Sequence, residues 1–343
     1  MVAEPEVLAR VMVEEIIEPD LPICDPHHHL WDRAAREDRP RDTYLLEELL
    51  QDIGDDHNIV KTVFVDCRSM YRQGGPEEMR CVGETEFVQG IAAQSASGQY
   101  GTTRVAAGIV SHADLTLGAA VAPVLEAHIA ASVNRFRGIR HSTVWDDSPE
   151  ITRYMSPPRW LLSDSKFREG FGYLQKYGLS FDAWLYHHQI TELADLARAF
   201  PDTTIILDHI GGLIGIGPYA GKREEIFQQW KSSIAEISTC PNVVVKVGGL
   251  GMPVCGFGWD ERTLPPDSTE LAEATAPYYL WCIEKFGVNR CMFESNFPVD
   301  KASYSYTVMW NAFKRITEDF SPTEKAALFH DTAVRVYRLY DEI

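Results

Sequence analysis

Short, nearly continuous apolar runs rich in β-branched residues recur along the chain, and longer amphipathic segments separate them. Eight such runs cover residues Leu21–His29, Lys61–Cys67, Arg104–Ser111, Phe136–Ser142, Leu179–Tyr186, Thr203–Ile210, Asn242–Gly248 and Arg290–Asn296. A run that is apolar on both faces predicts a strand buried in a parallel sheet. Segments between the runs, such as 190–200 and 224–237, carry apolar residues three or four positions apart, which predicts helices. The alternation of strand and helix predicts the α/β class.

Eight strand-and-helix units in succession favour a (β/α)8 barrel, the TIM barrel, over a doubly wound open sheet. We therefore expect a single domain over residues 1–343, with residues 1–20 as an N-terminal extension. Two long connections, 143–163 and 248–268, follow the fourth and seventh predicted strands and are rich in proline, glycine and tryptophan. In a barrel they would extend over the mouth where active sites lie, so we predict lid-like insertions there.

The composition is that of a folded protein, with 45% hydrophobic and 24% charged residues. The formal net charge of -18, with no cluster of basic residues, argues against nucleic acid and anionic membranes as partners. The 7 cysteines are scattered and form no C-x-x-C motif, which favours the reducing cytoplasm. Acidic residues interrupt the apolar run within residues 1–20, so we expect neither a signal peptide nor a membrane span there.

Three consecutive histidines close the first predicted strand, in the sequence CDPHHHLWD at residues 24–32. This internal position excludes a purification tag. Alternate side chains of a strand share a face, so we expect His27 and His29 to point together and His28 to point away. Two imidazoles on one face at the end of a barrel strand predict a metal site, and a packed histidine cluster is the alternative. Asp25 would orient a ligand from the same face.

Other histidines also lie at or just beyond the ends of predicted strands, namely His112, His141, His187, His188 and His209. His209, in TIILDHIGG, is the strongest candidate for a further ligand, because two glycines follow it and allow a sharp turn beside a ligand. Strand alternation turns Asp208 to the opposite face. For any one of these histidines, a hydrogen-bonded residue of the core or rim is the alternative.

The eighth run, in CMFESNFPVD, places Glu294 and Asn296 on one face that is aimed at the mouth. A buried carboxylate requires a partner. Glu294 is therefore predicted to bind a metal or, as the alternative, to form an internal ion pair with a lysine or arginine.

Basic residues at strand ends indicate what the substrate carries. Arg68, Arg140 and Lys246 could neutralise a carboxylate, with internal ion pairing as the alternative. Lys246 is the preferred candidate, because a lysine within an apolar strand has few favourable places for its charge. We assign His141, beside Arg140, and His188 to the same substrate-binding surface.

The H-x-H of the first strand, the D-H-x-G of the sixth and the F-x-S-N-F-P of the eighth resemble the amidohydrolase-related (amidohydrolase 2) family of metal-dependent hydrolases. The segments GPEEMRCVGETEFVQGIAA and FRGIRH are similar to family members related to lactonases of sugar acids and aromatic breakdown products. The resemblance extends over the whole barrel. It implies a metal-dependent or metal-derived hydrolase in which His27, His29 and His209 are ligands.

The chain departs from the family pattern at Asn296, because the family usually has aspartate there, which binds metal and accepts the proton of water. An amide oxygen can be a ligand but not a base. Glu294, one same-face step earlier, has a longer side chain that could supply the missing carboxylate, and would then be both ligand and catalytic base. Some relatives resemble decarboxylases, and a few resemble two-metal oxygenases.

Our leading hypothesis is an enzyme that cleaves a lactone or amide of a small anionic substrate with metal-activated water. Zinc is the expected metal, but histidine and carboxylate ligands also suit manganese and iron, as one ion or two. One alternative is a decarboxylase or a two-metal oxygenase that recruits His188 or Glu84. Another is a non-catalytic partner subunit of a homologous enzyme. For the assembly we expect a homo-oligomer or a homologous partner chain.

Overall fold

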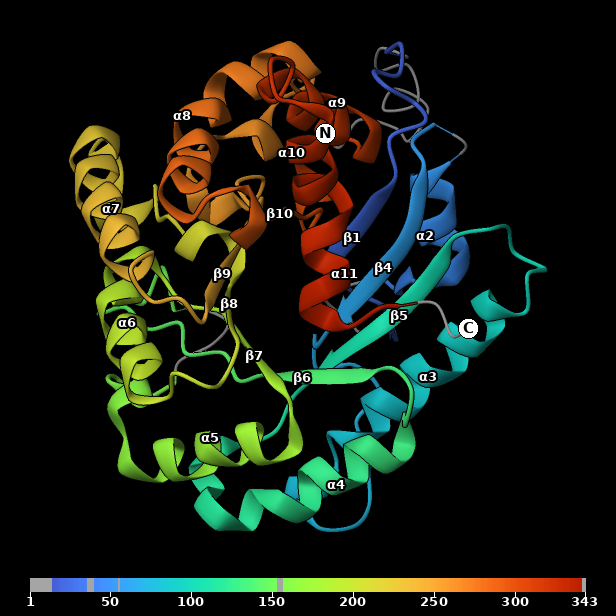
Figure 1. The fold of residues 1–343 in the computed structure, drawn as a ribbon, viewed down its shortest axis with the longest axis vertical. Helices are drawn as coiled ribbons and strands as arrows, with labels where there is room; N and C mark the ends of the chain where they lie inside the picture. The colour runs from blue at the N-terminus through green and yellow to red at the C-terminus, as the bar shows by residue number, and fades with distance from the viewer. Residues whose placement is uncertain (1–13, 36–39, 55, 153–156, 341–343) are drawn as a thin grey trace.

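A single barrel of eight parallel strands forms the centre of the molecule (Figure 1). The computed structural model describes residues 14–35, 40–54, 56–152 and 157–340. The barrel strands, in spatial and chain order, are β1 (Ile23–His28), β4 (Ile59–Val65), β5 (Arg104–Ser111), β6 (Phe136–Arg140), β7 (Ser180–Ala183), β8 (Ile205–Leu207), β9 (Val243–Val247) and β10 (Cys291–Phe293). Parallel strands buried on both faces explain the nearly continuous apolar runs of the sequence.

The first and last strands meet just beyond the end of β10. The Asn296 N–H donates to the His27 carbonyl at 2.9 Å, and the His29 N–H donates to the Phe297 carbonyl at 2.8 Å. These bonds bring the histidine run of β1 beside the segment that carries Glu294. The predicted barrel is thereby confirmed, and the doubly wound open sheet is not what the chain forms.

Helices surround the strands on the outside (Figure 1). They are α2 (Leu46–Ile53), α3 (Val82–Ala96), α4 (Ala122–Ala131), α5 (Ser165–Tyr177), α6 (Ile190–Ala199), α7 (Arg223–Ile237), α8 (Ser268–Phe286) and α9 (Tyr306–Ile316). The chain continues with α10 (Pro322–Ala326), the π-helical turn η11 (Ala327–Asp331) and α11 (Thr332–Tyr337). A two-stranded hairpin, β2 (Trp31–Arg33) and β3 (Asp42–Tyr44), was not predicted. No described helix has both the length and the apolar character that a membrane crossing needs.

One half of the barrel interior is apolar, and α11 packs against it. Inward side chains of the strands form one cluster with residues of the C-terminal segment, namely Cys24, Val63, Val65, Val110, Ile206, Val244, Met292, Ala333, Val336, Tyr337 and Leu339. The burial of so many apolar side chains stabilises the barrel at this end. Polar and charged side chains occupy the other half, at the C-terminal ends of the strands.

The predicted extension and insertions are only partly covered by the described residues. Residues 1–13 and 153–156 lie outside them. The Asn311 side chain of α9 donates to Glu14 and accepts from the Ile17 N–H, so the end of the extension lies on this helix. In the 248–268 connection, the Gly251 N–H donates to Asp300 at 3.0 Å. The role of this connection as a lid stays a prediction.

Candidate metal centre

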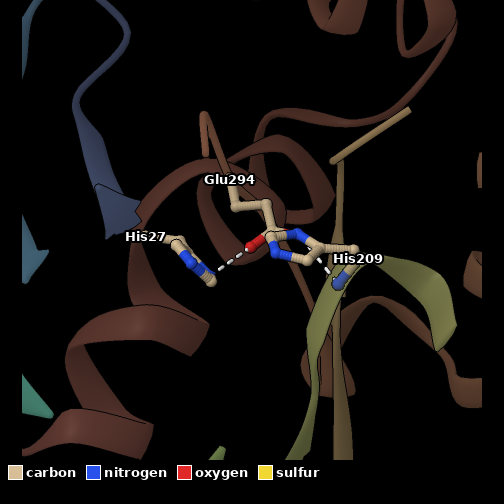
Figure 2. A group of neighbouring side chains, drawn as sticks. All are labelled: His27, His209 and Glu294. Carbon is tan, nitrogen blue, oxygen red and sulfur yellow. Dashed lines mark hydrogen bonds and ion pairs between the residues drawn. The ribbon is translucent and has the colours of Figure 1, made fainter. Parts of the chain in front are cut away.

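Three buried side chains from distant parts of the sequence converge at the mouth of the barrel (Figure 2). His27 lies at the end of β1, and His209 and Glu294 follow β8 and β10. Glu294 Oε1 accepts from His209 Nδ1 at 2.7 Å, and Glu294 Oε2 lies 2.8 Å from His27 Nδ1. One potential ligand atom from each side chain lies within 4.8 Å of the other two. Two imidazoles and one carboxylate are donors that suit zinc, manganese and iron.

The backbone around His209 explains how its side chain reaches Glu294. His209 and Ile210 have positive φ values of 53° and 50°, which interrupt the strand geometry directly after β8. The His209 N–H also donates to Glu294 Oε1, at 3.0 Å. A Cβ at Gly249 would lie 2.5 Å from His209 Nδ1, so this position requires glycine.

The structure corrects the prediction that Asp208 faces away from the site. Asp208 Oδ1 lies 3.0 Å from Lys246 Nζ and 3.7 Å from His27 Nδ1. Ile206 points into the barrel, so strand alternation turns Asp208 inward, and the left-handed backbone at residues 209 and 210 brings His209 to the same place. Asp208 and His209 therefore both belong to the polar cluster at the mouth.

Asp25 departs from strand alternation. A register shift in β1 falls between Asp25 and His28. The Asp25 carboxylate accepts from Ser295 Oγ at 2.6 Å, from the Tyr306 hydroxyl at 3.0 Å and from the His27 N–H at 3.2 Å. Asp25 thus holds the backbone of His27, and its role in orienting a ligand stays a prediction. Asp25 also connects β1 to the segment after β10.

His29 and Asn296 stand beside the group of three. The ring centroids of His27 and His29 are 5.0 Å apart, whereas His28 points away and accepts from Thr62 at 2.8 Å. Burial lowers the pKa of His29 well below its ordinary value, so the neutral ring has one N–H. We assign it to Nδ1, which donates to the Val65 carbonyl at 2.8 Å.

His29 Nε2 consequently carries a lone pair, and it faces Asn296 Oδ1 at 3.3 Å. The amide orientation is fixed, because Asn296 Nδ2 donates to Asp300 Oδ1 at 2.7 Å. Two hydrogen-bond acceptors thus face each other in a buried place, an arrangement that a cation would satisfy.

Charged side chains surround the group of three, and the carboxyl groups exceed the cations. Lys246 Nζ donates to Asp182 Oδ1 at 2.6 Å and lies 3.2 Å from His27 Nδ1. Arg140 Nη1 lies 3.4 Å from His27 Nε2 and 3.9 Å from Asp208. The carboxyl groups in contact with these cations or with His27 are those of Asp66, Asp182, Asp208 and Glu294. Four buried carboxyl groups against two cations require bound protons or a further cation.

Glu294 is a candidate both for a bound proton and for contact with a further cation. Burial raises the pKa of its carboxyl to about 8, although the charges of Lys246 and Arg140 act in the opposite direction. Its Oε2 has no hydrogen bond of good geometry, although His27 is close. The donor set and this unsatisfied buried oxygen fit a divalent metal ion. Among the described residues, no second group of histidine, cysteine and acidic side chains has such spacing.

The five side chains assigned to the substrate lie in three different places. Arg68 and His141 line one cavity of about 390 Å³ at the ends of β4 and β6, together with His112 and Ser142. Arg140 and Lys246 are buried in the charged cluster, so that internal pairing, the alternative reading, describes their contacts. His188 lies apart, where its Nε2 donates to the Trp145 carbonyl at 2.9 Å.

Sequence reasoning missed Asp66 and Asp182, which pair with Arg140 and Lys246. Each lies inside or directly after an apolar strand, in VFVDC and SFDAW. A carboxylate at such a position requires a buried partner, and that signal could have identified both. Glu84 accepts from the Ser69 N–H at 2.7 Å, and the structure does not bring it to His188.

The fold and the site together define a class, a (β/α)8 barrel with histidines of the first and sixth barrel strands and a carboxylate after the eighth at its mouth. The family model described as Amidohydrolase matches residues 24–339, and the chain belongs to this family. The resemblance inferred from the sequence motifs is thereby confirmed.

Relatives of similar length support this assignment, and a solved structure shares the fold. The protein y4mH of Sinorhizobium fredii is 35% identical, over 93% of this chain and 99% of its own. An L-fucono-1,5-lactonase of Burkholderia ambifaria is 24% identical, over 92% of this chain and 95% of its own. The crystal structure of an amidohydrolase from Burkholderia multivorans with bound zinc has a TM-score of 0.68 at 22% identity, and covers 93% of this chain and 99% of that one.

Proposed function

We propose that this protein is a metal-dependent hydrolase that opens a lactone or amide of a small anionic substrate. The observation that carries the proposal is the convergence of His27, His209 and Glu294 within 4.8 Å, in a buried cluster with more carboxyl groups than cations. The amidohydrolase family and the lactonase names among the relatives support the reaction class.

His27, His209 and Glu294 would hold the metal, with His29 and Asn296 as further candidate ligands beside them. A divalent cation held there would supply Lewis acidity, which activates water and polarises a carbonyl group. Zinc is the first choice, and manganese and iron suit the same donors.

Glu294 is the residue that moves the proton. Its Oε2 has no hydrogen bond of good geometry and can accept a proton from the attacking water. Its burial also allows this carboxyl group to hold that proton and return it to the leaving oxygen or nitrogen. Asn296 has no comparable role, because an amide is not a base at neutral pH.

The remaining polar residues would orient groups rather than react. Lys246 and Arg140 lie beside His27 and would balance the charge of the carboxyl groups around the metal. Arg68 and His141 would receive the anionic part of the substrate, because they line the open cavity at the strand ends. His188 would contact the substrate at the more distant side of the mouth.

Metal analysis combined with a hydrolysis assay tests the proposal. We expect the purified protein to bind a divalent metal and to open a lactone that carries a carboxylate faster than the uncharged L-fucono-1,5-lactone. His27→Ala and His209→Ala should lose both metal and activity, whereas His330→Ala, which replaces a histidine paired with Asp331 outside the barrel, should keep both. A wild-type protein without metal, whose hydrolysis is unchanged by His27→Ala, would refute the proposal.

A further inference from the structure

The C-terminal segment contributes one polar contact to the charged cluster. Tyr337, at the end of α11, is fully buried among the apolar side chains that fill one half of the barrel. Its hydroxyl donates to Asp182 Oδ1 at 2.6 Å. The end of a TIM barrel opposite the mouth usually concerns stability alone. Here a residue of that apolar half also reaches a carboxylate of the functional half.

The contact is the first of three that lead to His27. Asp182 Oδ1 accepts from both the Tyr337 hydroxyl and Lys246 Nζ, each at 2.6 Å. Lys246 Nζ in turn lies 3.2 Å from His27 Nδ1. All four side chains are fully buried, so water does not compete for these contacts.

We infer that Tyr337 is a positioning residue of the metal centre. Its hydroxyl holds Asp182, and Asp182 holds the ammonium group of Lys246, whose charge lies 3.2 Å from His27 Nδ1 and 3.0 Å from Asp208 Oδ1. This inference rests on the proposed function, because it concerns where a positive charge sits beside a ligand of that centre. Residues that contact the ligands without binding the metal commonly change metal affinity or activity by 10–100-fold when they are replaced.

The geometry explains why the hydroxyl matters in addition to the ring. Asp182 Oδ2 has no hydrogen bond, so both donors act on Oδ1, and the loss of one leaves the carboxylate free to rotate. Lys246 has a flexible side chain whose charge is held between Asp182 and Asp208, at 2.6 Å and 3.0 Å. A rotation of Asp182 would therefore move Nζ relative to His27.

Tyr337→Phe is the decisive variant, because it removes the hydroxyl and keeps the ring that packs in the barrel. Tyr44→Phe is its matched control. Tyr44 is also a buried tyrosine whose hydroxyl donates to an aspartate, Asp52, at 2.7 Å, but that pair lies outside the barrel. Val336→Ala is the packing control, since it weakens the same apolar cluster without touching the hydroxyl.

The measurements are Zn²⁺ affinity by competition with a chelator, the absorption spectrum of the Co²⁺-loaded protein, and kcat and KM for a lactone. For Tyr337→Phe we expect Zn²⁺ binding and kcat each reduced about tenfold, an altered Co²⁺ spectrum, and KM within about twofold of wild type. Tyr44→Phe should match wild type. Val336→Ala should lower the melting temperature and leave Zn²⁺ affinity and the spectrum unchanged.

Three outcomes would overturn the inference. The first is a Tyr337→Phe protein that binds Zn²⁺ and turns over like wild type. The second is a Val336→Ala protein that loses Zn²⁺ affinity to the same extent, which would assign the effect to packing. The third is a wild-type protein that neither binds metal nor hydrolyses a lactone, and this result alone would refute the proposed function as well.

Discussion

Two pairs of histidines lie at the mouth of the barrel, and their surroundings differ. His27 and His209 have ring centroids 4.5 Å apart and are buried with Glu294. His112 and His141 have ring centroids 5.1 Å apart and line an open cavity of about 390 Å³ with Arg68. The first pair meets a carboxylate inside the protein, and the second pair meets an arginine at the surface.

Hydrogen bonds show what each pair can offer. His141 Nδ1 accepts from the Leu115 N–H at 3.2 Å, so its proton is on Nε2, which can donate to a ligand. The Arg68 guanidinium has no ion pair or hydrogen bond among the described residues, and Ser142 Oγ is buried without a hydrogen bond. The enclosed pair thus presents acceptors that suit a cation, whereas the open pair belongs to a surface with unused donors. Residue type alone would not have separated the two roles.

The largest effect should come from Glu294, which distinguishes the enclosed pair. Glu294→Gln keeps the shape and removes the negative charge and the base, so we expect loss of metal binding and a kcat reduced about 10²- to 10⁴-fold. The measurements are metal stoichiometry and steady-state kinetics. Glu192→Gln is the control, since Glu192 is a buried glutamate of α6 that accepts from Ser163. An active, metal-loaded Glu294→Gln protein would contradict the assignment of the metal to the pair that lies with Glu294.

A smaller effect of another kind should follow from a change at Arg68. If the open cavity binds the anionic part of the substrate, Arg68→Gln should raise KM about tenfold, equivalent to about 1.4 kcal/mol, and leave kcat nearly unchanged. The assay is steady-state kinetics on a lactone that carries a carboxylate. Arg72→Gln, which removes a surface arginine paired with Glu86, serves as the control for net charge. Equal KM values for the Arg68 and Arg72 variants would contradict a role for the cavity.

The barrel and the histidines of its mouth could be predicted because they depend on local pattern. Each strand is apolar on both faces, and parallel strands place their C-terminal ends at one edge, so His27, His209 and Glu294 had to lie near one another. That inference needed only the order of the strands, and the structure brings the three side chains together.

The contacts around that group could not be predicted, because they depend on departures from regular geometry or on distant partners. A register shift in β1 separates Asp25 from His27, and two positive φ values after β8 bring His209 to the inward side that Asp208 already occupies. Strand alternation fails at both of these breaks. Tyr337 and Asp182 are 155 positions apart, and no local pattern indicates that the end of the last helix meets the fifth barrel strand.

A third effect, on stability and not on activity, concerns protonation of the open pair. Burial, followed by the charge of His112, lowers the pKa of His141 to about 3, from 6.5 in an unfolded chain. Between these two pKa values the unfolded chain binds more protons than the folded one. The free energy of unfolding therefore decreases as the pH falls below 6.5. His141 should therefore lower the free energy of unfolding by about 1–2 kcal/mol when the pH falls from 7.5 to 5.

His141→Asn tests this, because the amide oxygen can replace Nδ1 as the acceptor for the Leu115 N–H without gaining a proton. Urea unfolding at pH 7.5 and pH 5 should show a smaller loss of stability for this variant than for wild type. His330→Asn, outside the barrel, should lose as much stability as wild type. If His141→Asn instead shows the full acid sensitivity, His141 takes up a proton in the folded protein, and the open pair would then carry positive charge toward the substrate cavity.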